Sequence, residues 1–242
     1  MKYAQLILSL IISFGSLSSC DYNTSYVEGN KNRISETREL ESFEDIHITG
    51  NFNISFVQNN KHKADLTCSS NIGNYIMSEV QNNTLYISVP ENILIKEDKP
   101  IDLTIHLKTL NSLTTKGKTK IKTTEKLHAK YLEIECIGSS KLDLNIDANK
   151  LNVNLPGASS FNLNGKINDV NIVSSGALQY NANDCEVDFY NITMNGAGNA
   201  KVKVNKSLKV QINGAGNLLY TGTPDKVISN IGGIGKVKRS EK

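Results

Sequence analysis

Apolar and polar residues alternate along most of the chain beyond Leu40, and this period of two is typical of β-strands with one buried face. The early alternating runs have these apolar members: Ile46 and Ile48; Phe52, Ile54 and Phe56; Ala64, Leu66 and Cys68; Leu85, Ile87 and Val89; and Ile101, Leu103, Ile105 and Leu107. The runs are separated by Gly50-Asn51, Asn59-Asn60 and Asn82-Asn83, which are typical turn pairs. The first part of the chain is therefore predicted to be rich in strands.

One stretch departs from this alternation and predicts a short helix between Asn71 and Glu79. Ile72, Ile76 and Val80 are spaced four residues apart and would lie on one helical face. The side chain of Asn71 can accept a hydrogen bond from a free backbone N–H of the first turn, so it is a suitable cap.

A repeat of about 19 residues dominates the second half of the chain. Glycine recurs at Gly117, Gly138, Gly157, Gly176, Gly196, Gly214 and Gly233. The positions two, four and six residues before these glycines, and the position four residues after them, are apolar in almost every repeat. The column two residues before glycine contains, for example, Leu155, Met194 and Ile212. This pattern predicts a solenoid, in which each unit buries its apolar face only by stacking on its neighbours.

Each repeat consists of a strand, a glycine turn and a second strand. The predicted fold is therefore all-β: a single-chain parallel β-helix with an N-terminal β-rich capping region. Gly196 and Gly214 should occupy equivalent corners of neighbouring rungs, where glycine permits positive φ or close approach of stacked backbones. Asparagines that share a column should form outward-facing ladders, and they are Asn152, Asn171 and Asn191 in one column and Asn145, Asn164 and Asn183 in another.

The first twenty residues have the organisation of a bacterial export signal. Lys2 supplies a positive charge, an apolar run follows over residues 6–14, and Leu17-Ser18-Ser19-Cys20 completes the segment. The run is too short to span a bilayer, and its end resembles a lipobox, whose cysteine is acylated after cleavage. A plain signal peptide with an incidental cysteine is the alternative. We expect a lipoprotein signal peptide over 1–19, lipidation at Cys20 and anchoring to the outer membrane through the acyl chains.

Composition divides the remaining chain into a tether and one domain. Residues 20–38 are polar and lack periodicity, so they predict a flexible tether. The solenoid domain is expected over 39–239, with 39–109 as its N-terminal part and 110–239 as the repeated rungs. Without the signal peptide the chain carries 26 basic and 24 acidic side chains, a net charge of +2. Its basic residues form no cluster with aromatic residues, which argues against a nucleic-acid partner.

Three cysteines remain within the predicted domain: Cys68, Cys136 and Cys185. An odd number cannot form a complete disulfide framework. Free, buried thiols are the favoured interpretation, and one disulfide with one free thiol is the alternative.

The ionisable residues do not assemble into a recognisable catalytic or metal site. The acidic residues of the rungs fall in different columns: Glu133, Glu135, Asp143, Asp147, Asp169, Asp184 and Asp188. Asp143 would stack on Asn162 and Asn181, which cannot act as general acids. Asp169 and Asp188 are about one residue out of register. His47, His62, His106 and His128 lack the spacing of metal ligands, and Cys-x-x-Cys is absent from the sequence. We predict no catalytic residue, cofactor or metal.

Two sets of residues, one at each end of the predicted domain, carry a family resemblance. The early set is Phe43, Ile46, Gly50 and Phe52, and the late set is Leu219-Tyr220-Thr221-Gly222-Thr223-Pro224 and Gly233-Ile234-Gly235-Lys236-Val237. Both sets resemble the head GIN domain family. The resemblance covers about residues 40–239, although many turns read Gly-Ala-Gly or Gly-Ser-Ser instead of the family's Gly-Ser-Gly. It implies a β-solenoid of the cell envelope, in a family described as auto-transporter adhesins. It supplies no functional residues.

Three functional hypotheses follow. The favoured one is a non-catalytic, lipid-anchored protein of the cell envelope that presents its solenoid surface to a glycan or protein ligand. A glycan-active β-helix enzyme would need two carboxyl groups about 5–9 Å apart in a groove. A structural or assembly component would show an exposed end rung that can add a strand from a partner.

Overall fold

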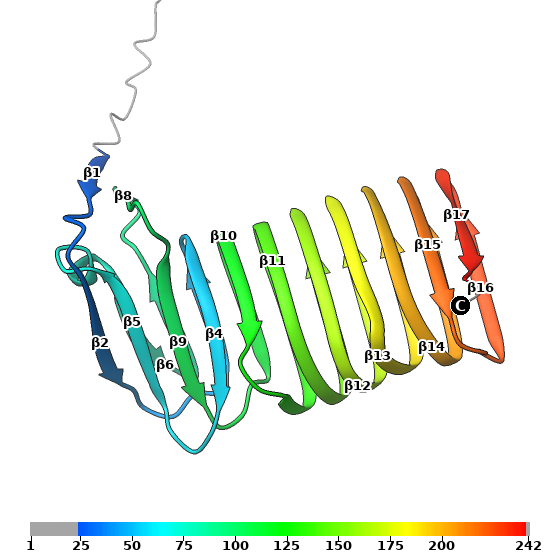
Figure 1. The fold of residues 1–242 in the computed structure, drawn as a ribbon, viewed down its shortest axis with the longest axis horizontal. Helices are drawn as coiled ribbons and strands as arrows, with labels where there is room; N and C mark the ends of the chain where they lie inside the picture. The colour runs from blue at the N-terminus through cyan, green and yellow to red at the C-terminus, as the bar shows by residue number, and fades with distance from the viewer. Residues whose placement is uncertain (1–23, 241–242) are drawn as a thin grey trace, which may run out of the picture.

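The computed structural model describes residues 24–240, which form an elongated β-solenoid (Figure 1). The rungs lie side by side, from β2 at one end to β16 and β17 at the other. The predicted all-β parallel β-helix is confirmed. The predicted signal peptide and Cys20 lie outside the described residues.

The described residues contain seventeen strands and one short 3₁₀ helix. The first nine strands are β1 (Ser25–Glu28), β2 (Arg33–Glu39), β3 (Asp45–Thr49), β4 (Phe52–Gln58), β5 (Lys63–Ser69), β6 (Met77–Gln81), β7 (Thr84–Ser88), β8 (Ile93–Lys96) and β9 (Ile101–Leu107), with η1 (Gly73–Tyr75) after β5. The others are β10 (Ser112–Thr123), β11 (Leu127–Leu155), β12 (Ala158–Ser174), β13 (Ala177–Met194), β14 (Ala197–Ile212), β15 (Ala215–Thr221), β16 (Lys226–Ile231) and β17 (Ile234–Arg239).

The repeated rungs stack in parallel, in the register that the glycine repeat predicts. Gly117 lies opposite Gly138, and Phe161 lies between Leu142 and Tyr180 of the neighbouring rungs. The column four residues before glycine is at most 2% exposed in five successive rungs, at Ile134, Val153, Ile172, Ile192 and Val210. Each apolar column is therefore a continuous part of one core along the solenoid axis.

Close approach of stacked backbones explains most of the repeating glycines. Gly117 and Gly138 have positive φ, +129° and +114°. Gly196 and Gly214 do not have positive φ, but a Cβ on either would lie 2.0 Å from the carbonyl oxygen of the glycine one rung earlier. Gly196 and Gly214 thus occupy equivalent, touching corners, as predicted. Of the two reasons anticipated for glycine at these positions, close approach of the backbones applies and positive φ does not.

The asparagine ladders form only in part. The side chain of Asn191 donates to Oδ1 of Asn171 at 2.9 Å, as predicted for that column. The next member, Asn152, donates instead to the hydroxyl of Tyr131. In the second column Asn145 lies opposite Asn164, but a register shift just beyond Asn162 interrupts the pairing with the next rung.

The N-terminal part of the domain supplies two further rungs that stack out of chain order. β3 and β4 form one rung around Gly50 and pair with β10. β7 and β9 form the other rung and pair with β3 and β4. The order along the solenoid is therefore residues 84–107, then 45–58, then 112–123. The region predicted as a cap is partly solenoid.

Antiparallel strands close this end of the solenoid. β5 pairs with β9, β2 pairs with β5, and β6 pairs with β7. Asn82 and Asn83, with φ of 49° and 64°, form the turn between β6 and β7.

The prediction of a flexible tether over 20–38 is wrong for β1 and β2. β1 pairs with β8, and β2 pairs with β5 through the backbone and makes side-chain contacts with both β5 and β9. Thr37 donates to Asp65 at 2.6 Å, and Arg33 donates to Asp102 at 2.9 Å. These partners lie far along the chain, so the polar composition of this segment did not reveal that it is ordered.

The predicted helix over residues 71–79 is also wrong, because the chain makes only the 3₁₀ turn η1 before it enters β6. Ile72 and Ile76 are buried, as their spacing suggested. Arg38 takes the backbone carbonyls that a helix would use, since its guanidinium donates to the carbonyls of Gly73 and Ile76. Tertiary contacts thus replace the helical hydrogen bonds.

The three cysteines of the domain are free and buried, which confirms the favoured interpretation. Burial raises the pKa of all three thiols, and that of Cys185 rises to about 12. A thiol that remains protonated is a poor nucleophile and a poor metal ligand. The cysteines therefore contribute to packing in the core.

Candidate functional site

A long groove, the corner groove, runs along the solenoid beside the glycine corners. It encloses about 1350 Å³. One wall consists of residues 116–120, 139–141, 158–160, 177–179 and 197–199, which follow or include the corners of five successive rungs. The opposite wall includes 93–95 and 97–101, the excursion that contains β8 and interrupts the rung of β7 and β9.

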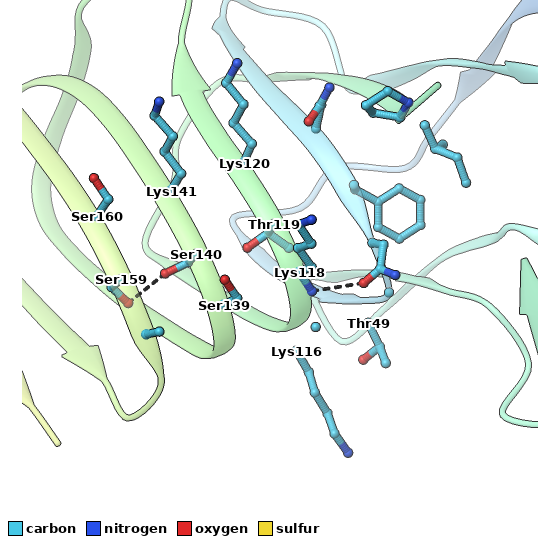
Figure 2. Close-up of a pocket in the computed structure, with 18 of the residues that line it drawn as sticks. Thr49, Lys116, Lys118, Thr119, Lys120, Ser139, Ser140, Lys141, Ser159 and Ser160 are labelled. Atoms are coloured by element: carbon cyan, nitrogen blue, oxygen red, sulfur yellow. Dashed lines mark hydrogen bonds between the residues drawn. The ribbon is translucent and has the colours of Figure 1, made fainter. Parts of the chain in front are cut away.

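One outward-facing column of this groove is polar on every rung. It consists of Lys120, Lys141, Ser160, Gln179 and Asn199, which lie opposite one another in register. Figure 2 shows Lys120 and Lys141 extending side by side from neighbouring rungs, whereas Lys116 points the opposite way. Because neighbouring strands are about 4.8 Å apart, a ligand along the solenoid axis would meet a polar side chain at each such step.

The column next to it, two residues closer to the corners, has mostly small side chains. Lys118 lies opposite Ser139, Ser139 lies opposite Ala158, and Ala177 lies opposite Ala197. Small side chains leave the backbone accessible from the groove. On the opposite wall, Leu94 is 48% exposed. The groove therefore combines a polar column with a neighbouring column of mostly small side chains, and it has an exposed leucine among its lining residues.

In the chain as described, the charged side chains of the corner groove that have no partner are positive. Lys118, Lys120 and Lys141 are exposed, and within the described residues none of them has an ion pair. The groove's two carboxylates are already engaged. Glu97 accepts hydrogen bonds from Ser69 at 2.7 and 2.8 Å, and Asp98 pairs with Lys31 at 3.2 Å. Stacked like charges repel each other, so the arrangement of Lys120 beside Lys141 favours an anion between them.

Two of the histidines come near each other in the fold, because Lys63, which follows His62, lies opposite His106. His106 also has a partner that the sequence did not indicate. Its Nε2 lies 3.0 Å from Asp65, and its Nδ1 lies 3.0 Å from the side-chain nitrogen of Asn59. Burial would raise the pKa of Asp65, but hydrogen bonds from Lys63 and Thr37 outweigh it and lower the pKa. Both ring nitrogens of His106 are occupied, so this pair has no free nitrogen to act as a base.

Several acidic residues of the rungs lie out of register with one another or are paired with lysines. Asp143 stacks on Asn162, as predicted, and Asp169 lies opposite Phe189 rather than Asp188. A second hollow, of about 530 Å³, contains Asp147, Glu186 and Asp188, but each carboxylate has its own lysine: Lys126, Lys203 and Lys206. Hydrogen bonds from Lys206 and Asn205 lower the pKa of Asp188. A general acid requires the opposite shift.

The corner groove was not predicted from the sequence, yet the sequence contains one signal for it. Lys116, Lys118, Lys120 and Lys122 alternate along β10, so all four are exposed, although Lys116 points away from Lys120 across the corner (Figure 2). The wall across the groove had no such signal, because it depends on how the excursion around β8 folds back. Among residues 24–240, no group of histidine, cysteine and acidic side chains could hold a metal ion.

The architecture defines the class of protein: a parallel β-solenoid with glycine corners and an antiparallel cap at one end. The chain belongs to the head GIN domain family, since residues 42–224 match the family model described as "Putative auto-transporter adhesin, head GIN domain". The resemblance noted in the sequence is thereby confirmed. No curated protein sequence matches the chain. Within the described range, no helix has the length and apolar character needed to cross a membrane.

Several solved structures share this fold. A protein of Bacteroides fragilis described as a "putative adhesin" is 22% identical, with a TM-score of 0.83 over 88% of this chain and 100% of that chain. A "putative lipid binding protein" of Parabacteroides distasonis is 17% identical, with a TM-score of 0.70 over 90% of this chain and 100% of that one. A "putative adhesin" of Parabacteroides merdae is 19% identical, with a TM-score of 0.66 over 89% and 99%. At sequence identities this low, the structural similarity shows that the proteins share a fold.

Proposed function

We propose that this chain is a non-catalytic, lipid-anchored binding protein of the cell envelope, and that the corner groove holds an extended anionic ligand. The observation that carries the proposal is the set of unpaired lysines, Lys118, Lys120 and Lys141, in a groove whose own carboxylates are engaged. The polar column that continues from them supplies hydrogen-bonding groups over three more rungs.

The expected ligand carries several negative charges, which are either spaced along an extended molecule or clustered at a surface. An acidic glycan fits the length of the groove and its hydroxyl and amide groups. An anionic lipid headgroup fits the same lysines, with the exposed Leu94 beside them. One relative, from Parabacteroides distasonis, is described as lipid binding, so binding to anionic lipid should be measured separately from binding to glycan. A non-catalytic role agrees with the engaged carboxylates and with the occupied nitrogens of His106.

The test reverses the groove charges with Lys118→Glu, Lys120→Glu and Lys141→Glu together. We expect the wild-type chain to bind polygalacturonate or phosphatidylglycerol vesicles, and to ignore dextran and phosphatidylcholine vesicles. Each lysine–anion contact in water contributes about 1 kcal/mol. The triple variant should therefore bind about a hundredfold more weakly. Surface plasmon resonance with immobilised glycan and co-sedimentation with vesicles would measure the two sources separately.

A matched control reverses three exposed lysines outside the groove, Lys61, Lys150 and Lys209, so the net charge changes equally. This control should retain nearly full binding. Equal losses in the two triple variants would show that net charge, not the groove, attracts the ligand. Absence of binding to both acidic probes would contradict the proposal.

The lipid anchor is tested by Cys20→Ala. The motif Leu17-Ser18-Ser19-Cys20 leads us to expect that this variant is not acylated and is released from membranes or remains unprocessed. Metabolic labelling with a clickable palmitate and membrane fractionation would follow both effects. A variant that is processed normally and fractionates with membranes as the wild-type chain does would refute the anchor.

A further inference from the structure

The two ends of the solenoid are closed differently. At the N-terminal end, the outer edges of β9 and β7 are covered by the antiparallel strands β5 and β6. At the other end, β16 pairs only with β14 and β17 pairs only with β15. Within the described part of the chain, nothing pairs with the outer edges of these last two strands. Their free backbone N–H and C=O groups form a template for another strand.

The last rung also exposes apolar side chains that its neighbours bury. Val227 continues the column of Leu208, and Ile231 continues the column of Ile212. Leu208 and Ile212 are fully buried, whereas Val227 and Ile231 are each 39% exposed. All six residues of β16 are exposed. The core columns thus end at a face that a further layer of side chains would cover, as terminal repeats of solenoids normally require.

The charge of this rung selects the kind of partner. β17 carries Lys236, Lys238 and Arg239, β16 begins with Lys226, and neither strand contains an acidic residue. Antiparallel pairing of β17 with the β17 of a second copy would place lysines against lysines, which is unfavourable. The outermost strands at the N-terminal end of a second copy are β2 and β6. Their acidic residues are Glu36, Glu39 and Glu79, and β2 also carries Arg33 and Arg38, so neither strand presents an acidic face to β17. Another copy of this chain therefore fits the basic rung less well than an acidic segment does.

We propose that the open rung formed by β16 and β17 is a second interaction surface, which binds an extended acidic segment of another polypeptide by strand addition. The segment's backbone would pair with the free edges, its apolar side chains would cover Val227 and Ile231, and its acidic side chains would lie beside Lys236 and Lys238. This surface is distinct from the corner groove and takes a peptide instead of the proposed groove ligand.

The test uses short fluorescent peptides and the full chain. One peptide alternates valine with glutamate, a second alternates valine with lysine, and a third is the glutamate peptide with N-methylated backbone amides. Fluorescence anisotropy should show that the glutamate peptide binds about tenfold or more tightly than the lysine peptide. The N-methylated peptide should lose binding, because strand addition needs its amide hydrogens. Reversal of the rung charges with Lys236→Glu and Lys238→Glu should reverse the preference between the first two peptides.

Two further variants locate the contact. Val227→Lys with Ile231→Lys should weaken binding about tenfold, whereas Ile34→Lys, at an equally exposed position on the opposite end, should not. The groove triple variant should bind the glutamate peptide as the wild-type chain does. Peptide binding that depends on the groove lysines would overturn this inference and leave the groove proposal intact. Failure of all peptides to bind, or self-association of the chain that Val227→Lys abolishes, would also overturn it.

Discussion

Gly214→Val should lower the free energy of unfolding by about 3 kcal/mol or more, which is at the upper end for overpacked sites. The new Cβ would lie 2.0 Å from the carbonyl oxygen of Gly196 and 2.6 Å from that of Asn195. Both contacts are with backbone, so no side chain can move aside to relieve them. The rungs must separate, and the hydrogen bond from the N–H of Ala215 to the carbonyl of Gly196 must lengthen from 3.1 Å. Chemical denaturation would measure the loss.

Gly232→Val is the matched control, since it adds the same side chain to the next rung. Its Cβ would meet no atom closer than 3.7 Å, and Gly232 does not have positive φ. This change should alter stability by at most about 0.5 kcal/mol. The double variant Gly196→Val with Gly214→Val should be non-additive because the two corners touch. Similar small losses for Gly214→Val and Gly232→Val, with strict additivity in the double variant, would contradict the stacked corners.

Met194→Asp should have a comparably large effect, about 4 kcal/mol or more. Met194 is 1% exposed and lies opposite Ser174 and Ile212, so the introduced carboxyl would have no charged partner. Burial raises the pKa of such a carboxyl, and its charge is costly only where it would ionise. The destabilisation should therefore diminish as the pH falls from that raised pKa towards about 4, the ordinary value for aspartic acid, below which the charge contributes nothing. Thermal unfolding at several pH values would reveal both effects.

Two variants separate charge from loss of volume. Asn195→Asp adds the same carboxyl at the adjacent exposed position, where Oδ1 accepts a hydrogen bond from Asn213 at 2.7 Å, and should change stability by at most about 0.5 kcal/mol. Met194→Leu keeps the volume nearly constant and should cost less than about 1.5 kcal/mol. Equal melting temperatures for Met194→Asp and Asn195→Asp would refute the assigned inward and outward positions.

The solenoid was predictable from the sequence because its pairing partners repeat at a nearly constant interval. Gly196 and Gly214, with Met194 and Ile212 two residues before them, show the register without any other information. The same regularity correctly placed Asp143 beside Asn162. Buried free cysteines followed from their odd number and from the position of Cys136 in an apolar column.

The N-terminal part was less predictable because its contacts are specific and distant. Nothing in the alternation of β4 indicates that Phe52 lies opposite Ile101 on one side and Thr119 on the other. The apolar spacing of Ile72 and Ile76 suggested a helix, and the hydrogen bonds of Arg38 decided against it. The corner groove could be predicted only on one side, from the lysines of β10, since its other wall depends on the excursion around β8.

The out-of-order stacking of the N-terminal rungs has a consequence for synthesis of the protein. β4 lies between β9 and β10, both of which follow it in the chain, so its two edges remain unpaired until residues up to 123 have been made. β11 and the later rungs can add one after another onto a finished edge, with contacts mostly between adjacent repeats. We therefore expect assembly of residues 45–123 to be the slow step of folding, because non-local pairings must close long loops first. Growth of the remaining solenoid should follow that nucleus in chain order.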